Sequence, residues 1–264
     1  MILSRPNFRS ICPIFATLQF CLISAFAEEP SQKFRVDRFS GVTVATQDQA
    51  MSMVMFRHKN APMVGERAPN SVLIDGQSGE KTTLHTLVNE RPLVMIFGSS
   101  SCNNFDLYFS DIAKFQKQYG GQFDFALIYI REAHPKGGFM PKTFREGEKI
   151  DFPAVEDART VRERRKQALD LQKLISPEMK VYVDTLDDET GVRWGAWPQR
   201  IFVVGTDHKL LYSGGPGPWH FKLTRSGWHT RAPIAMESEF SRMPFTRTSL
   251  EEFLSSYSAE NEAE

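Results

Sequence analysis

The chain has 264 residues, of which 41% are hydrophobic and 24% are charged. This composition is typical of a globular protein with one sizeable core, arranged as one domain with extensions. Lys and Arg together number 32, as do Asp and Glu, so the formal charge is zero. Because the chain lacks the basic excess of a nucleic-acid-binding protein, nucleic acid is excluded as an expected partner.

The first 27 residues have the pattern of a secretory signal peptide. Arg5 and Arg9 supply a basic start, residues 11–26 are mostly apolar, and cleavage is expected after Ala27. The protein is therefore expected to be secreted or periplasmic. The alternative is an uncleaved membrane anchor, although a proline and a glutamine interrupt an apolar run that is already short for a bilayer span.

The cysteine count limits the role of the one cysteine that cleavage would leave. Cys12 and Cys21 lie in the predicted signal peptide, so Cys102 alone would remain. A chain with one cysteine forms no internal disulfide, which excludes a structural staple. The count leaves two alternatives for Cys102: a thiol that is used in chemistry, or a buried bystander.

Beyond the signal peptide we expect an N-terminal extension over residues 28–60, a domain over 61–258 and an acidic tail over 259–264. Residues 221–246 lack clear periodicity and are interpreted as a C-terminal insertion. Within the domain, short apolar runs predict strands at residues 72–75, 82–84, 93–97, 123–130, 180–184, 201–204 and 209–212. Amphipathic periodicity and capping signals predict helices at residues 84–88, 104–119, 157–175 and 248–257.

The predicted order is strand, helix, strand, then helix, strand, β-hairpin and closing helix. This is the thioredoxin-like arrangement, an α/β fold with a central mixed sheet flanked by helices. In an open α/β sheet, ligands bind beyond the carboxyl ends of the strands. That rule brings four segments to one edge, namely the loops 98–102, 131–134 and 214–219 and the strand start at Pro198.

Cys102 is predicted to begin a helix, where backbone N–H groups and the helix dipole favour a thiolate. Its pKa is therefore expected to lie below that of a free thiol. Ser99 and Ser101 add hydroxyl groups that could donate to the sulfur or hold a leaving group. The second cysteine of a Cys-x-x-Cys pair is missing, with Phe105 in its place, so an external thiol reductant would be needed and no bound cofactor is expected.

His134 is the histidine that connectivity places at this edge. It is a candidate general acid, with Glu132 to orient it and Tyr129 nearby. The alternative is a loop histidine that is hydrogen-bonded to the backbone. The other histidines are scattered without metal-ligand spacing, so no metal site is expected.

Three further residues are candidates for a pocket that binds an aromatic substrate. Trp197 and Pro198 precede one predicted strand, and Trp219 ends the Gly/Pro-rich loop that follows its hairpin partner. Each aromatic residue, taken alone, is more often part of a core. Pro198 is also a candidate cis-proline.

Four motifs, in this order, resemble those of the iodothyronine deiodinase family. They are Arg-Pro-Leu-Val-x-x-Phe-Gly-Ser at 91–99, Tyr-Ile-x-Glu-Ala-His-Pro at 129–135, Val-x-Val-Asp at 181–184 and Tyr-x-Gly-Gly-x-Gly-Pro at 212–218. The resemblance runs from about Val64 to Trp219. It implies a thioredoxin fold with a selenocysteine nucleophile that removes iodine from thyroid hormones, using a thiol cosubstrate.

The same resemblance indicates which residues match the family's site and where this chain differs from the family. Cys102 matches the selenocysteine position, and Tyr129, Glu132 and His134 match residues thought to bind substrate or relay protons. Sulfur is a poorer nucleophile than selenium. The chain also departs from the family in having Ser100 two residues before Cys102, no second histidine near residues 150–154, and Gln199 where the family has glutamate.

Three functional hypotheses follow. In the first, a thiol-dependent oxidoreductase of deiodinase type dehalogenates an iodinated aromatic, with Cys102 as nucleophile. In the second, a one-cysteine, peroxiredoxin-like peroxidase converts Cys102 to a sulfenic acid. In the third, the domain is a binding module whose Cys102 is idle. The expected partners are a small aromatic or peroxide substrate and a thiol reductant, and a homodimer remains open.

Overall fold

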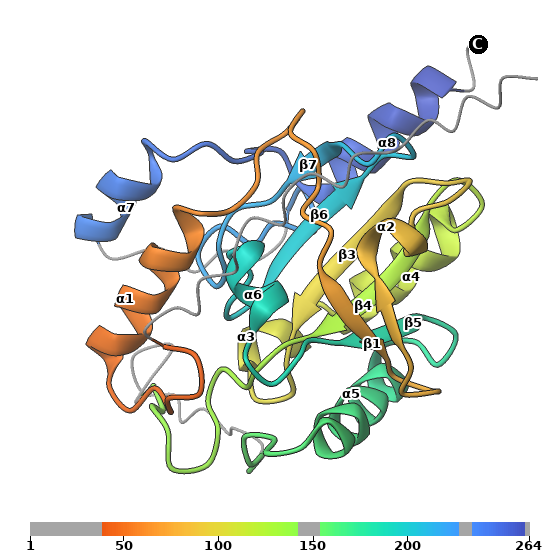
Figure 1. Ribbon diagram of the computed structural model, residues 1–264. Coiled ribbons are helices and arrows are strands. Elements are labelled where there is room, and N and C mark those ends of the chain that lie inside the picture. The colour runs from red at the N-terminus through yellow and green to blue at the C-terminus, as the bar shows by residue number, and fades with distance from the viewer. Residues whose placement is uncertain (1–38, 142–153, 227–233, 262–264) are drawn as a thin grey trace, which may run out of the picture. The chain divides into compact units, whose positions relative to one another are not determined.

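The computed structural model describes residues 39–141, 154–226 and 234–261. A seven-stranded mixed sheet runs through them in the order β2-β1-β5-β4-β3-β6-β7 (Figure 1). The strands are β1 (Val72–Asp75), β2 (Lys81–Thr83), β3 (Leu93–Gly98), β4 (Asp124–Tyr129), β5 (Lys180–Val183), β6 (Arg200–Val204) and β7 (Leu210–Ser213). The central strands β3, β4 and β5 are parallel, whereas β6 is antiparallel to β3 and β7 to β6.

The helices are α1 (Gln47–His58), α2 (Leu84–Leu87), α3 (Asn103–Asp106), α4 (Phe109–Tyr119), α5 (Val161–Ile175), α6 (Glu189–Arg193), α7 (Ile234–Phe240) and α8 (Leu250–Asn261). Helices α4 and α5 pack against each other, and α5 also packs on β4 and β5. The order β3-α4-β4, then α5-β5, the β6-β7 hairpin and α8 confirms the thioredoxin-like α/β fold.

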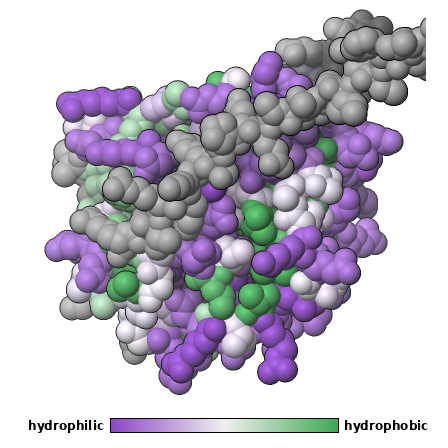
Figure 2. Space-filling model, in the orientation of Figure 1, coloured by the Kyte–Doolittle hydropathy of each residue, from purple (hydrophilic) through white to green (hydrophobic). Residues whose placement is uncertain are grey.

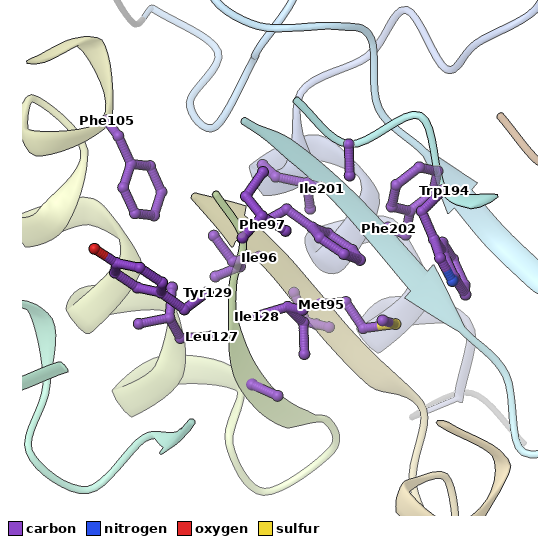
Figure 3. Close-up of a cluster of buried hydrophobic side chains, with 14 of the residues drawn as sticks. Met95, Ile96, Phe97, Phe105, Leu127, Ile128, Tyr129, Trp194, Ile201 and Phe202 are labelled. Carbon is purple, nitrogen blue, oxygen red and sulfur yellow. The ribbon is translucent and has the colours of Figure 1, made fainter. Parts of the chain in front are cut away.

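The core explains why the central strands are continuous apolar runs. Every residue of β3 is buried, as are five of the six residues of β4. Figure 3 shows side chains of these two strands packing with those of β6 and with Trp194. Strands that are covered on both faces lose the alternation of apolar and polar residues, so they are apolar throughout.

Two predicted segments differ from the structure. The helix predicted over residues 104–119 is divided into α3 and α4, because the backbone departs from helical geometry at Tyr108, where φ is −108° and ψ is 0°. The start of this segment is drawn to the sheet by Phe105, whose ring is fully buried. The insertion at residues 221–246 is not wholly irregular, since it contains α7.

The surface in Figure 2 is largely hydrophilic, with a limited group of hydrophobic residues near its centre. Large apolar side chains that are well exposed include Val64, Leu107 and Leu174, which belong to different segments. Scattered exposed apolar residues are normal for a globular protein. The homodimer therefore stays a prediction.

The predicted localisation is corrected. Among the described residues, no helix is long and apolar enough to cross a membrane. The predicted signal peptide, with its alternative of a membrane anchor, falls on residues 1–27, outside the described residues. No observation of the molecule supports secretion or a periplasmic location, and we withdraw both.

Candidate active site

Parallel pairing of β3 and β4 brings their carboxyl ends to one edge of the sheet. Gly98 pairs with Tyr129, so the loop that contains Cys102 and the loop that contains His134 begin side by side. Strand β6 runs the opposite way and starts with Arg200 opposite Phe97. The Trp197–Pro198 peptide, which is cis, therefore lies at the same edge.

A cavity of about 190 Å³ opens at this edge. Its lining includes five of the predicted site residues, namely Cys102, His134, Trp197, Pro198 and Trp219. The N-terminal helix α1 forms another part of the wall through Gln47, Ala50, Met51 and Val54. Sequence reasoning missed this wall, because α1 is rich in methionine but has only a weak apolar face.

Cys102 is the N-cap residue of α3, as predicted, but its side chain is only 4% exposed. Burial raises the pKa of the Cys102 thiol to about 12. The backbone N–H groups of Phe105 and Asn104 oppose this rise, and the nearby Asp106 carboxylate adds to it. The expectation of a lowered pKa is wrong, because removing the charged form from water outweighs what a helix of four residues contributes.

The thiol has a partner that the sequence did not suggest. Cys102 Sγ donates to Gln199 Oε1 at 3.6 Å, and Gln199 is fully buried. Gln199 follows the cis-proline and precedes β6, so the same edge geometry positions it. In the sequence, Gln199 directly follows Pro198 and departs from the family's glutamate, but nothing there indicates its contact with the thiol.

Glu132 is the centre of a buried hydrogen-bond network. Its Oε2 accepts from the backbone N–H of Ser101 at 2.8 Å and from the Ser101 hydroxyl at 2.6 Å. Its Oε1 accepts from the Tyr129 hydroxyl. Burial raises the pKa of Glu132, whereas the bonds from Ser101 and Tyr129 oppose that rise. The network joins the loop after β3 to the loop after β4.

His134 is held at two points. Its backbone N–H donates to Ser101 Oγ at 2.9 Å, and its ring Nδ1 donates to the Phe139 carbonyl at 2.9 Å. The ring is therefore oriented at Nδ1 by a carbonyl, and Glu132 supports the loop through the Ser101 hydroxyl. Burial lowers the pKa of His134, so the ring is neutral near pH 7.

The serine hydroxyls serve the loop rather than the sulfur. Ser99 Oγ accepts from the backbone N–H of Ala133 at 3.1 Å, and Ser101 Oγ bonds to Glu132 and His134 as described. The sequence allows Ser99 and Ser101 to donate to Cys102, but their observed partners lie in the loop after β4. The structure uses them to fix the position of His134 because both side chains are buried between the two loops.

Phe105 fills the place of a second cysteine. Its ring lies over Gly98, where an added Cβ would come within 2.4 Å of a ring atom. The ring also packs edge-to-face on Phe109 and Phe221. This position therefore supplies packing, and Cys102 has no neighbouring cysteine among the residues that the structure describes.

A buried ionic cluster fixes the cavity wall. Asp188 lies 3.2 Å from both Arg57 and Arg131, and 3.7 Å from Arg164. All four side chains are almost fully buried. Arg57 belongs to α1, and Arg131 belongs to the loop that contains His134, so Asp188 ties both to the start of α6.

The sequence model of the iodothyronine deiodinase family matches residues 5–228. The chain belongs to the iodothyronine deiodinase family. The match begins inside the predicted signal peptide, so the family pattern extends into that segment. The resemblance predicted from the four motifs is thereby confirmed. Named members of this family are oxidoreductase enzymes.

Deiodinases from vertebrates are similar to the chain over part of its length. A type II iodothyronine deiodinase from Gallus gallus is 30% identical over 196 residues, which cover 65% of this chain and 66% of the relative. A thyroxine 5-deiodinase from Sparus aurata is 28% identical over 162 residues, which cover 61% and 57%. The chain thus spans less than two thirds of the length of these two relatives.

Solved structures similar to this deiodinase-family chain are more distant. A hypothetical protein from Sinorhizobium meliloti 1021 has 18% identity and a TM-score of 0.45, covering 72% of this chain and 90% of its own. The thioredoxin domain of a thiol-disulfide oxidoreductase from Bacteroides vulgatus has 14% identity and a TM-score of 0.39, covering 58% and 89%.

Proposed function

We propose that this protein is a thiol-dependent oxidoreductase that removes iodine from an aromatic ring, with Cys102 as the nucleophile. The observation that carries the proposal is the shared cavity. Cys102 and His134, the candidate nucleophile and proton carrier, line it together with Trp197 and Trp219. A nucleophile and a proton carrier in one apolar, partly enclosed site are what a reductive dehalogenation requires.

The cavity favours a neutral iodinated ring. An engineered cavity of about 150 Å³ binds benzene, so about 190 Å³ suits one ring with a halogen. The described lining contains no lysine, arginine, aspartate or glutamate, so a charged substituent would have to project out of it. Aromatic side chains on the wall favour stacking on the substrate ring.

His134 supplies the proton transfer. Because its Nδ1 hydrogen is bonded to the Phe139 carbonyl, the neutral ring has its lone pair on Nε2. Nε2 accepts the Cys102 proton, which gives a thiolate and an imidazolium. The thiolate attacks iodine, an S–I bond forms as the C–I bond breaks, and the electron pair left on carbon takes the proton from His134.

The second half of the reaction needs an external thiol. One thiol displaces iodide from the S–I bond and forms a mixed disulfide with Cys102, and a second thiol releases the Cys102 thiol and a disulfide. Since Phe105 occupies the place of a resolving cysteine, both thiols come from the reductant. The protein needs no bound cofactor for this cycle.

The peroxidase hypothesis is less favoured. A peroxidatic cysteine reacts as a thiolate in the resting site, and redox-sensing cysteines combine low pKa with solvent access. Cys102 has a raised pKa and is buried. Such a thiol is protected from oxidants until a base in the same cavity deprotonates it.

The test is iodide release by the purified full chain from an iodinated phenol in the presence of a dithiol. We expect release by the unaltered protein and a loss of at least about 100-fold in Cys102→Ser, because hydroxyl oxygen is a far weaker nucleophile than thiolate. Cys21→Ser is the matched control and should retain full release. Equal release by Cys102→Ser and the unaltered protein would refute the proposal.

A further inference from the structure

Gln199 has a buried amide whose oxygen bonds to the Cys102 thiol and whose nitrogen lacks a described partner. Its Oε1 accepts from the Cys102 thiol at 3.6 Å, and its side chain is 0% exposed. Its Nε2 is also buried, and no hydrogen-bond partner reaches it among the residues that the structure describes. A buried amide N–H without a partner is costly, and one beside a reactive sulfur calls for an explanation.

The protonation state of the Cys102 sulfur decides which atom of the Gln199 amide can form a hydrogen bond with it. A thiol has one hydrogen to donate, so it bonds to the amide oxygen. A thiolate has none, and it is stabilised by an N–H donor through a charge-assisted bond that is stronger than a neutral one. A half-turn of the amide about Cγ–Cδ exchanges Oε1 and Nε2 in nearly the same volume.

The surroundings restrict Gln199 to this motion. An added Cβ at Gly217 would lie 2.2 Å from Gln199 Cγ, so the glycine leaves room only for the stem of the side chain. The Gly217 N–H also donates to the Gln199 backbone carbonyl at 3.1 Å. The stem is thereby fixed, and the terminal amide remains the part that can turn.

We propose that Gln199 holds the Cys102 thiol in the resting site and, by turning its amide, donates a hydrogen bond to the thiolate during the reaction. The proposal rests on the nucleophilic role of Cys102. A glutamate at this position could accept from the thiol but, when ionised, would repel the thiolate.

Other groups also face Cys102, and the backbone N–H groups of Phe105 and Asn104 already favour its thiolate. Asp106 and Glu132 are carboxylates whose charges disfavour a thiolate. Tyr108 is close enough for its own pKa to respond to the charge on Cys102. His134 shares the cavity and takes the proton. Because none of these groups is altered in a Gln199 variant, a change in Cys102 reactivity reports on the amide.

The experiment measures the rate at which iodoacetamide alkylates Cys102 in the full chain as a function of pH, followed by mass spectrometry of the peptide that contains Cys102. Gln199→Met keeps the shape of the side chain and removes the amide. We expect alkylation about tenfold slower at a given pH, which corresponds to a rise of about one pH unit in the profile. Gln199→Glu should be slower still.

Gln172→Met is the matched control. Gln172 is another buried glutamine, but it lies in α5 and donates to the carbonyls of Pro177 and Met179, which follow that helix. Its variant should keep the wild-type alkylation profile. A profile for Gln199→Met that is unchanged, or shifted to lower pH, would overturn the proposal.

Iodide release separates this inference from the proposed function. If the alkylation profile shifts but the unaltered protein releases no iodide, the amide role stands and the dehalogenation is wrong. If the unaltered protein releases iodide and the profile of Gln199→Met does not shift, dehalogenation stands and the amide role is wrong.

Discussion

The Ser101 hydroxyl donates to Glu132 Oε2 at 2.6 Å and at the same time accepts the backbone N–H of His134 at 2.9 Å. One side chain thus sets the distance between the loop of the nucleophile and the loop of the histidine. Proton transfer depends on such positioning, because small displacements of reacting groups cost large factors in rate.

Ser101→Ala tests this bridge. The substitution leaves the Glu132 carboxylate and the His134 N–H each without one buried partner, so we expect a loss of about 1–3 kcal/mol in the free energy of unfolding. Iodide release should fall by at least about tenfold because His134 is no longer fixed. Urea unfolding and iodide assays measure the two effects. Ser238→Ala, at an exposed position, should leave both unchanged.

Asp188→Asn tests the ionic cluster that holds the cavity wall. Removing the carboxylate leaves Arg57, Arg131 and Arg164 buried with less compensating charge, which should cost about 3–5 kcal/mol in the free energy of unfolding. Asp170→Asn is the control, because Asp170 pairs with lysines on the solvent side of α5 and such pairs contribute less than about 1 kcal/mol. Similar losses for the two variants would contradict the role given to Asp188.

His58 predicts how stability depends on pH. It is buried beside Phe240 and Phe245, and burial, with the nearby Arg200 charge, lowers its pKa from 6.5 to about 2. Below pH 6.5 the His58 ring is protonated in the unfolded chain but stays neutral in the folded protein. The contribution of His58 to the free energy of unfolding is therefore fully present above pH 6.5 and is lost as the pH falls toward 2.

His58→Phe should remove part of this acid sensitivity. At pH 4, protonation of His58 in the unfolded chain lowers the free energy of unfolding of the unaltered protein by at most about 3 kcal/mol. The variant lacks this group, so it should lose less stability between pH 7 and pH 4. Urea unfolding at both pH values measures the difference. Equal losses in the two proteins would show that His58 is not the group responsible.

Met51 tests whether α1 shapes the substrate site. It lines the cavity, and Met51→Trp would fill part of the space for the substrate ring. We expect KM for an iodinated phenol to rise about tenfold, the equivalent of about 1.4 kcal/mol of lost binding, with a smaller effect on kcat. Ser52→Trp, at the exposed neighbouring position, should keep the wild-type KM. A KM that does not respond to Met51→Trp would place the substrate elsewhere.

The sequence was sufficient for the parts of the fold that depend on local pattern. Continuous apolar runs located β3 and β4, and connectivity alone brought Cys102, His134 and Pro198 to one edge. These features follow from the period of the side chains and from the parallel pairing of strands, which the order of residues determines.

The features that the sequence did not predict depend on contacts between distant segments. The pKa of Cys102 is raised because other elements bury it, and position at a helix start could not indicate how much water would be excluded. The roles of Ser99 and Ser101 were misassigned because partners about thirty residues away hold both hydroxyl groups. The Ser101 hydroxyl donates to Glu132, and the Ser99 hydroxyl accepts from the Ala133 N–H. The α1 wall was missed because weak amphipathicity gives no sign of which surface a helix covers.

The most direct test of the central claim is a single turnover without reductant. The unaltered protein is mixed with an excess of an iodinated phenol in the absence of any thiol, and the deiodinated phenol is quantified. If Cys102 takes iodine from the ring, the account predicts one equivalent of product per chain, and none from Cys102→Ser. Product from Cys102→Ser, or many equivalents without a thiol, would contradict it.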